Sequence, residues 1–332
     1  MTHTLMAQEA TQSPSVIAQQ LSDNLDLCQK LALDISVFDP SMVYIIGRGS
    51  SDHAGVFAKY LIEIEMGIPV SSSAPSVFSV YNKKLKLNKA LVLVISQSGG
   101  SPDIIAQAKA AKESGALTIA LVNTPNSPLS DIVDAELPLR AGEELAIAAT
   151  KSYLATLSAI LQLVACWKQD EALLSALQNL PAQLTSAIAS PAKLTHDFVA
   201  DLAHCVVLGR GLGYAVSREI ALKLKEVCSV HAEAFSSAEF LHGPVTLVEK
   251  SLSLIDVAVC DESQSAHETI MADINSRGSH AISIGLSIEG THARCMPLLI
   301  LQRFYLDIEL IARQMGLNPD KPAGLKKVTK TL

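Results

Sequence analysis

The amino-acid sequence predicts an α/β protein built from two tandem units, each a parallel β-sheet flanked by helices in a three-layer sandwich. The chain has 332 residues, which is long enough for two domains of about 150 residues each. Hydrophobic residues make up 49% of the chain and aromatic residues only 4%, so alanine and aliphatic side chains must fill the core. This composition is typical of parallel sheets that are covered by helices on both faces.

An internal repeat is the second observation that predicts this fold. Gly47 aligns with Gly209, each within a Gly-Arg-Gly turn that follows a short apolar run and precedes a helical pattern. Further along, Gly115 aligns with Gly278, each between a predicted helix and the next apolar run. Because the two anchors keep the same spacing to within one residue, we interpret the two halves as a duplication. Strands that alternate with helices place their strand-to-helix turns at the carboxyl edge of the sheet, where such folds bind ligands.

Five segments are expected along the chain. They are an N-terminal helical segment at 1–40, the first repeat at 41–168, a helical linker at 169–198, the second repeat at 199–318 and a C-terminal tail at 319–332. In the first repeat, apolar runs and helical periodicity predict strands at 43–46, 90–95 and 117–122 and helices at 102–114 and 151–167. In the second repeat, they predict strands at 206–208, 252–259 and 281–284 and helices at 219–226, 264–277 and 298–315.

Charge and hydropathy argue against several classes of protein. A net charge of −7 and a pI near 5.7 disfavour a nucleic-acid partner, which would require a basic surface. The N-terminus has no basic region followed by an apolar run, and the apolar stretch at 154–167 is shorter than the roughly 20 residues of a membrane span. We therefore expect a cytoplasmic protein without a membrane segment. The six cysteines lack close pairing and metal-ligand spacing, which indicates buried free thiols.

A serine- and glycine-rich turn follows the predicted strand at 90–95. It contains Ser96, Gln97, Ser98 and Ser101, and Pro102 opens the next helix. Ser101 is a natural N-cap, and proline fits the first helical position. Backbone N–H groups and hydroxyls at a helix N-terminus favour phosphate binding, although a loop that only caps its helix is the simpler alternative.

The Gly-Arg-Gly turn of the first repeat is a second loop of this kind. A dinucleotide-binding fingerprint would have glycine at the position of Asp52, and the second copy has Tyr214 there. The glycine-rich pattern of nucleotide-hydrolysing proteins is also missing from the sequence. We therefore expect neither an organic cofactor nor a metal.

A charged helix face in the second repeat suggests acid–base chemistry. Glu219, Lys223 and Glu226 are spaced so that they share one face of a helix, and a solvated row of ion pairs is the simplest interpretation of that spacing. The nearby motif His231-Ala-Glu and His242 add imidazoles and carboxylates. This grouping favours proton transfer without a metal. The residues alone thus predict a phosphate site and an acid–base site.

These motifs resemble the sugar isomerase (SIS) family, and most closely the isomerase half of the glucosamine-6-phosphate synthases. The matching segments run from about residue 45 to the C-terminus: Ser96-Gln-Ser-Gly, Ala149-Thr-Lys-Ser, Ala221-Leu-Lys-Leu-Lys-Glu, His231-Ala-Glu-Ala-Phe, Leu241-His-Gly-Pro, and Asp320-Lys-Pro with Leu325-Lys-Lys. The helix motif combined with His-Gly-Pro is specific to this group. The resemblance implies two tandem SIS domains with a flavodoxin-like three-layer sandwich in each.

The resemblance also implies roles for individual residues. The residues that match those holding the sugar phosphate are Ser51, Ser96, Gln97, Ser98 and Ser101, with Gly49 and Ala149 as further sugar contacts. The residues that match the catalytic ones are Glu226 as the base between C1 and C2, His242 for ring opening, Lys327 near C1 and C2, and Glu219 with Lys223 as paired charges. In this family the histidine comes from the neighbouring subunit, which implies a homodimer with a shared site. Ala149 departs from the usual serine and Arg48 from the usual small residue.

The expected reaction follows from one further departure. The synthases begin with a glutaminase domain that carries a nucleophilic cysteine at residue 2, whereas this sequence has Thr2 and about 40 residues before the first repeat. We therefore expect that the chain does not take ammonia from glutamine. The leading hypothesis is deamination of glucosamine 6-phosphate to fructose 6-phosphate. The alternatives are a fructosamine-6-phosphate deglycase, a galactosamine-6-phosphate deaminase, and a non-catalytic SIS protein that senses a sugar phosphate.

Overall fold

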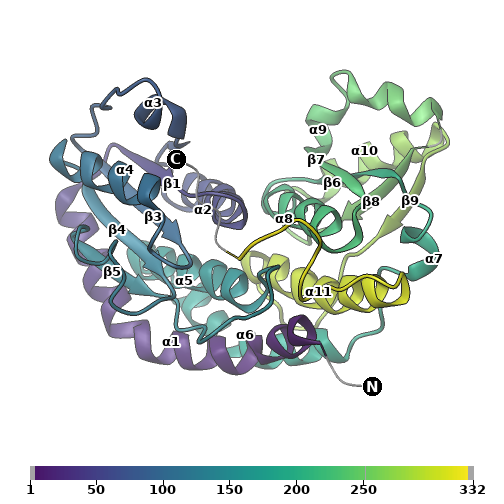
Figure 1. Ribbon diagram of the computed structural model, residues 1–332, viewed down its shortest axis with the longest axis horizontal. Helices are drawn as coiled ribbons and strands as arrows, with labels where there is room; N and C mark the ends of the chain where they lie inside the picture. The colour runs from purple at the N-terminus through teal and green to yellow at the C-terminus, as the bar shows by residue number, and fades with distance from the viewer. Residues whose placement is uncertain (1–3, 251, 328–332) are drawn as a thin grey trace. The chain divides into compact units, whose positions relative to one another are not determined.

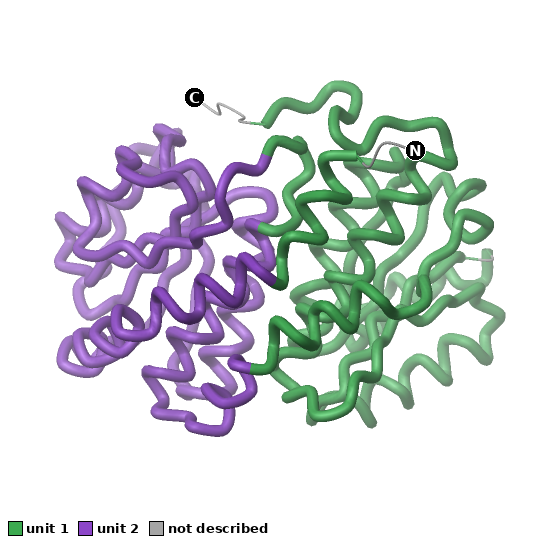
Figure 2. The backbone as a smooth tube through the Cα atoms, turned by 90° about the horizontal axis from the view of Figure 1, so that it is seen from below, with its two compact units in different colours: residues 1–14, 145–151, 179–327 green, residues 15–144, 152–178, 328–332 purple. Residues whose placement is uncertain are grey.

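A computed structural model describes residues 4–250 and 252–327 of the chain. These residues form two compact units, which Figure 2 shows in different colours. Unit 1 contains residues 4–14, 145–151 and 179–327 except residue 251, and unit 2 contains residues 15–144 and 152–178. Helices α1 (Leu5–Phe38), α5 (Lys151–Lys168) and α6 (Glu171–Ala189) each contribute residues to both units.

Unit 2 is built on a five-stranded parallel sheet with the strand order β2-β1-β3-β4-β5 (Figure 1). The strands are β1 (Met42–Ile46), β2 (Val70–Ser72), β3 (Ala90–Ser96), β4 (Leu117–Val122) and β5 (Ala135–Pro138). The central pair is in parallel register, with Ile46 opposite Val94. Because β1 and β3 are neighbours and parallel, the loops that follow them leave the sheet at the same edge.

Helices cover both faces of this sheet. Besides parts of α1, α5 and α6, they are α2 (Ser50–Met66), α3 (Pro75–Ser79) and α4 (Pro102–Glu113). Ile104 and Ala108 of α4 pack against Val92 and its neighbours in the core. On the other face α2 comes so close to β1 that a Cβ at Gly55 would lie 2.7 Å from the Ile45 side chain. With helices on both faces, β3 is buried along its whole length.

Unit 1 is built on a four-stranded parallel sheet with the order β7-β6-β8-β9. The strands are β6 (His204–Gly209), β7 (His231–Ser236), β8 (Ser253–Val257) and β9 (His280–Ser283). The helices are α7 (His196–Val199), α8 (Leu212–Cys228), α9 (Ser237–Phe240), α10 (Gln264–Ser276) and α11 (Met296–Gln314), with 3₁₀ turns η1 (Pro244–Lys250) and η2 (Ala293–Cys295). Phe240, Leu254 and Ile274 lie in a core cluster that joins α9, the sheet and α10.

The two units repeat one topology, which confirms the predicted α/β fold class. The order β2-β1-β3-β4 in unit 2 corresponds to β7-β6-β8-β9 in unit 1. Gly49 and Gly211 begin the helices α2 and α8, each 17 residues long, with φ of 55° and 54° and ψ of −129° and −124°. This region of backbone space is open to glycine and strained for other residues. The same glycine-dependent turn is therefore used in both copies.

The structure bears on two expectations, the absence of a membrane-spanning helix and the burial of the cysteines. Among the described residues, no helix combines the length and apolar character that crossing a membrane requires. Five of the six cysteines are buried as expected, whereas Cys260 is exposed. Burial raises the pKa of the Cys205 thiol to about 12, so this thiol stays protonated and unreactive near neutral pH.

Candidate active site

The serine-rich loop follows β3, and its own hydroxyls shape it. Ser96 Oγ accepts a hydrogen bond from the Gly99 N–H at 3.1 Å, and Ser98 Oγ accepts one from the Gly100 N–H at 3.3 Å. Gly99 has a φ of 59°, and a Cβ at this position would lie 2.2 Å from Ser127 Oγ. The loop is therefore a tight turn that requires glycine at residue 99.

Helix α4 begins directly after this loop. Ser101 occupies its N-cap and Pro102 its first turn, as the sequence predicts. The Ser101 side chain, however, makes no capping hydrogen bond, so it leaves the N–H groups of the first turn to other partners. These N–H groups lie at the positive end of the helix dipole. Together with the Ser101 hydroxyl, they are suited to bind a phosphate.

The Gly-Arg-Gly loop lies beside the serine-rich loop because β1 and β3 are paired. Gly49 precedes α2, and Ser51 is partly buried in the first turn of that helix. Arg48 donates from Nε and Nη2 to Asp103 Oδ2 at 3.1 and 2.7 Å. Since Asp103 belongs to the first turn of α4, this ion pair connects the two loops. The departure at Arg48 therefore has a structural partner within unit 2.

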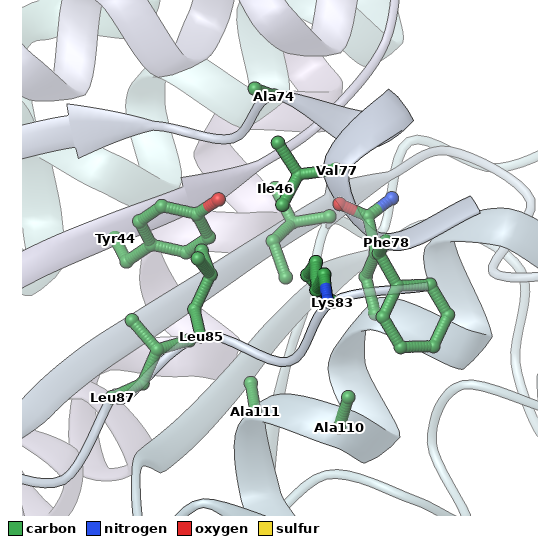
Figure 3. A pocket seen from close by; sticks show the side chains of 11 residues that line it. Tyr44, Ile46, Ala74, Val77, Phe78, Lys83, Leu85, Leu87, Ala110 and Ala111 are labelled. Atoms are coloured by element: carbon green, nitrogen blue, oxygen red, sulfur yellow. The ribbon is translucent and has the colours of Figure 1, made fainter. Parts of the chain in front are cut away.

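Unit 2 contains a cavity (Figure 3), and none of its lining residues belongs to these two loops. Its lining comes mainly from apolar side chains of β1, α3 and α4 and from the segment at 83–87. Its volume is about 30 Å³, which is room for about one water molecule and far less than a sugar phosphate occupies. This cavity is therefore not the substrate site, and the pair of loops, which the sequence predicts, stays the candidate substrate-binding surface of unit 2.

Unit 1 carries the predicted charged face on α8. Lys223 Nζ lies 2.6 Å from Glu226 Oε2 and 3.0 Å from Glu219 Oε1. The side chains of Lys223 and Glu219 are 1% and 0% exposed, whereas that of Glu226 is 21% exposed. The interpretation of this face as a solvated row of ion pairs is therefore wrong. Tertiary packing around α8 buries two of the three charges.

The ammonium group of Lys223 stays protonated in this cluster. Burial by itself lowers the pKa of the Lys223 ammonium, but the carboxylates of Glu219 and Glu226 outweigh burial and hold that pKa above its usual value. Lys223 is therefore a permanent cation near neutral pH. Glu226 presents a partly exposed carboxylate next to this cation, an arrangement that can accept and return a proton.

His242 lies on an exposed turn between α9 and η1. The backbone N–H of His242 donates to the carbonyl oxygen of Glu239 at 3.0 Å. The start of α9 is held by the buried His267, whose ring nitrogens lie 3.0 Å from Ser237 Oγ and 2.7 Å from Asp256 Oδ1. This contact has no local signal in the sequence, because its members come from three different elements. It fixes one end of the segment that presents the His242 imidazole.

The tail lysine contacts the segment at 145–151 within unit 1. Lys327 Nζ donates to Ala146 O at 2.5 Å. The N–H groups of Leu145 and Ala146 donate in turn to the carboxylate of Glu9, a buried residue of α1. Ala149, where the synthases usually have serine, lies further along the same segment. Sequence reasoning missed Glu9, which holds this segment from its other side.

The SIS domain family model matches residues 37–166 and 199–294, which is more than half of the chain. The chain belongs to the SIS domain family. Among its relatives, the isomerizing glutamine–fructose-6-phosphate aminotransferase of Clostridium tetani is 31% identical over 97% of this chain, and that of Staphylococcus aureus strain COL is 32% identical over 97%. The SIS chain spans 58% and 57% of the length of these two enzymes.

Several solved structures share this fold. A protein from Silicibacter pomeroyi DSS-3, provisionally assigned as a phosphosugar isomerase, is 36% identical with a TM-score of 0.89, covering 96% of this chain and all of that one. The C-terminal domain of glucosamine-fructose-6-phosphate aminotransferase from Francisella tularensis is 25% identical with a TM-score of 0.85, covering 97% and 99%. Glucosamine-6-phosphate deaminase from Thermotoga maritima is 21% identical with a TM-score of 0.78, covering 99% and 100%, a likeness of fold alone.

In this SIS protein the predicted site residues fall into two sets. The set in unit 2 lies on the two neighbouring loops and consists of Gly49, Ser51, Ser96, Gln97, Ser98 and Ser101. The set in unit 1 consists of Ala149, Glu219, Lys223, Glu226, His242 and Lys327. Three charges of the second set share one face of α8, whereas His242 and Lys327 come from separate segments.

Proposed function

We propose that this SIS protein is an amino-sugar-phosphate deaminase that converts glucosamine 6-phosphate and water into fructose 6-phosphate and ammonia. The observation that carries the proposal is the cluster on α8, where the partly exposed Glu226 carboxylate lies 2.6 Å from the buried Lys223 ammonium. The aminotransferases at 31% and 32% identity are named for fructose 6-phosphate, which supports a six-carbon sugar phosphate as the substrate. Water is the only co-reactant that the reaction needs.

The proposal assigns the phosphate to unit 2. The N-terminus of α4 presents backbone N–H groups, and the two loops supply hydroxyl and amide side chains. Such groups bind a phosphate dianion without proton transfer and hold the sugar in place. The residues proposed for this role are Ser51, Ser96, Gln97, Ser98 and Ser101, with Gly49 allowing close approach of the backbone.

The proposal assigns the proton transfers to unit 1. His242 protonates the ring oxygen as the bond between this oxygen and C1 breaks. The C1 hydroxyl gives its proton to water, which leaves the open-chain aldehyde. Glu226 then removes the proton from C2, and the electrons of that C–H bond form a C1–C2 double bond. The electrons of the aldehyde C=O bond move onto the C1 oxygen, which then takes a proton from water. Return of the proton to C1 leaves an imine at C2. Water adds to this imine and ammonia leaves, which gives the ketone of fructose 6-phosphate. Lys223 and Lys327 are positive charges that stabilise the developing oxyanion.

The first experiment measures both products from glucosamine 6-phosphate, with a chelator present and glutamine absent. Equal amounts of ammonia and fructose 6-phosphate are expected. Glu226→Gln should lower kcat by about 10²–10⁴-fold, because that is the usual contribution of a general base. Glu268→Gln, which removes an exposed carboxylate from α10, is the matched control and should leave kcat unchanged.

The same variants separate binding from turnover. Glu226→Gln should still be stabilised against heat by fructose 6-phosphate, because it retains the loops of unit 2. Near wild-type turnover of Glu226→Gln would refute its role as the base. If the wild type binds the sugar phosphate but releases no ammonia, the deaminase proposal fails. Galactosamine 6-phosphate and fructosamine 6-phosphate are then the next substrates for the same assay.

We further propose that the enzyme works as a homodimer in which His242 acts on substrate bound mainly by the neighbouring chain. This proposal extends the family resemblance of the Leu241-His-Gly-Pro segment. If it is correct, mixing the two inactive variants Glu226→Gln and His242→Ala should restore part of the activity, because some mixed dimers contain one site with both intact residues. Absence of any recovery after subunit exchange would refute a shared site.

A further inference from the structure

Among residues 4–250 and 252–327, Asp103 holds one side of the Arg48 guanidinium. Arg48 contacts Asp103 Oδ2 through Nε at 3.1 Å and Nη2 at 2.7 Å, which occupies one edge of the planar group. Arginine has five N–H donors arranged on two edges, so Nη1 and the outer N–H of Nη2 point away from Asp103. The Arg48 side chain is 46% exposed, which leaves this second edge accessible.

Asp103 determines where this second edge lies. It is in the first turn of α4, directly after Ser101 and Pro102, and its side chain is only 4% exposed. The two hydrogen bonds to Oδ2 therefore hold the Arg48 guanidinium at the N-terminus of the helix that follows the serine-rich loop. An arginine held by a buried carboxylate loses little further rotational entropy when a second anion binds to it.

The negative charge of Asp103 affects phosphate binding at the N-terminus of α4. A carboxylate in the first turn stabilises the helix but repels a phosphate that approaches the same N-terminus. Arg48 neutralises this carboxylate and adds donors for a second anion. We propose that Arg48 is a direct ligand of the substrate phosphate, oriented by Asp103. The inference rests on the proposed phosphate site of unit 2 and adds to it a charged ligand that replaces the usual small residue.

The second repeat offers a natural comparison. Arg210 occupies the position that matches Arg48, after Gly209. The loop after β8, however, has Ala258, Val259 and Cys260 where the first repeat has Ser96, Gln97 and Ser98. It also has Asp261 and Glu262 where the first repeat has two glycines, and Asp261 Oδ1 accepts the Ser263 N–H at 2.8 Å. Acidic side chains at this position are unsuited to a phosphate. Arg210→Ala therefore removes the same charge from the same turn in a copy without the serine-rich loop.

The test measures binding of inorganic phosphate and of fructose 6-phosphate by calorimetry, so it does not depend on turnover. The variants are Arg48→Ala, Asp103→Asn, their combination, and Arg210→Ala as the control. Arg48→Ala should weaken phosphate binding by at least about tenfold, because a hydrogen bond between charged groups contributes about that much affinity. In the Asp103→Asn background, where no carboxylate needs neutralising, Arg48→Ala should still weaken binding by about tenfold.

Each outcome decides the proposal. If Arg48→Ala has no effect in the Asp103→Asn background, Arg48 serves only to neutralise Asp103 and the proposal is wrong. If Arg210→Ala weakens binding equally, the effect is one of overall charge, and the proposal is also wrong. Arg48→Lys, which retains the charge without the two edges, should bind more weakly than wild type and guards against misfolding of the alanine variant. Phosphate binding that depends on Arg48 in a protein without deaminase activity would uphold this inference and overturn only the proposed reaction.

Discussion

Replacing Lys223 by methionine tests the charge balance of the α8 cluster. Methionine is similar in size but leaves Glu219, whose side chain is 0% exposed, without its ammonium partner at 3.0 Å. Removing one member of a buried ion pair costs about 3–5 kcal/mol, because the remaining charge is buried without compensation. The carboxylates hold the pKa of Lys223 above its usual 10.5 in spite of burial. Its contribution to stability is therefore complete below pH 10.5 and is lost as the pH rises through the folded-state pKa.

Urea unfolding followed by far-UV circular dichroism measures this loss. Lys225→Met is the matched control, since it makes the same change at an exposed position of the same helix and should cost less than about 0.5 kcal/mol. The fluorescence of Trp167, the single tryptophan, reports separately on unit 2. Adding Glu219→Gln to Lys223→Met should recover part of the stability. Equal losses in Lys223→Met and Lys225→Met would refute the conclusion that Lys223 compensates buried charge.

Two further predictions concern a turn and an ion pair. Gly99→Ala should lower phosphate affinity and cost more than about 1 kcal/mol of stability, because its Cβ would meet Ser127 Oγ at 2.2 Å with φ at 59°. Gly100→Ala, with no neighbour closer than 3.9 Å, is its control, and equal phosphate affinities of the two variants would contradict the role of the turn. Glu262→Gln should cost less than about 1 kcal/mol in thermal or urea unfolding at neutral pH, since Glu262 is 75% exposed in its pair with Arg294. Hydrogen bonding to Arg294 lowers the pKa of Glu262 to about 2. The difference in unfolding free energy between Glu262→Gln and wild type should therefore persist above pH 4.5 and vanish as the pH falls toward 2. A difference that does not change with pH would count against the pair.

The central strands could be predicted from the sequence, whereas among the edge strands β9 was predicted and β2, β5 and β7 were not. β3 is buried at all seven positions, and its first six residues form an uninterrupted apolar run before Ser96. β7 (His231–Ser236) lies at the edge of its sheet, and exposed polar residues interrupt its apolar ones. From the sequence alone, its residues indicate acid–base groups and no strand. β2 has only three residues, and two of them are exposed serines. An edge strand gains its stability from one neighbour, so its sequence carries less of the signal.

The candidate site shows the same division between local and tertiary information. The spacing of Glu219, Lys223 and Glu226 predicts a shared helix face, and the structure confirms that Lys223 contacts both carboxylates. Which of the three charges is buried depends on the elements packed around α8, and helical spacing contains no information about them. The contact between Arg48 and Asp103 was missed for a related reason. It forms because parallel pairing of β1 and β3 brings two loops together that are 55 residues apart.

The contacts of Glu9 have no local signal in the sequence, because its partners are distant along the chain. Its carboxylate accepts N–H groups from Leu145, which is 136 residues away, and from Ala146. The carbonyl of Ala146 accepts the ammonium of Lys327 from the other end of the chain. A single peptide segment thus links a buried acid of α1 to the tail lysine. The first turns of α1 lie outside both repeats in sequence, yet they belong to the unit that carries the proposed catalytic residues and fix the carbonyl that holds Lys327.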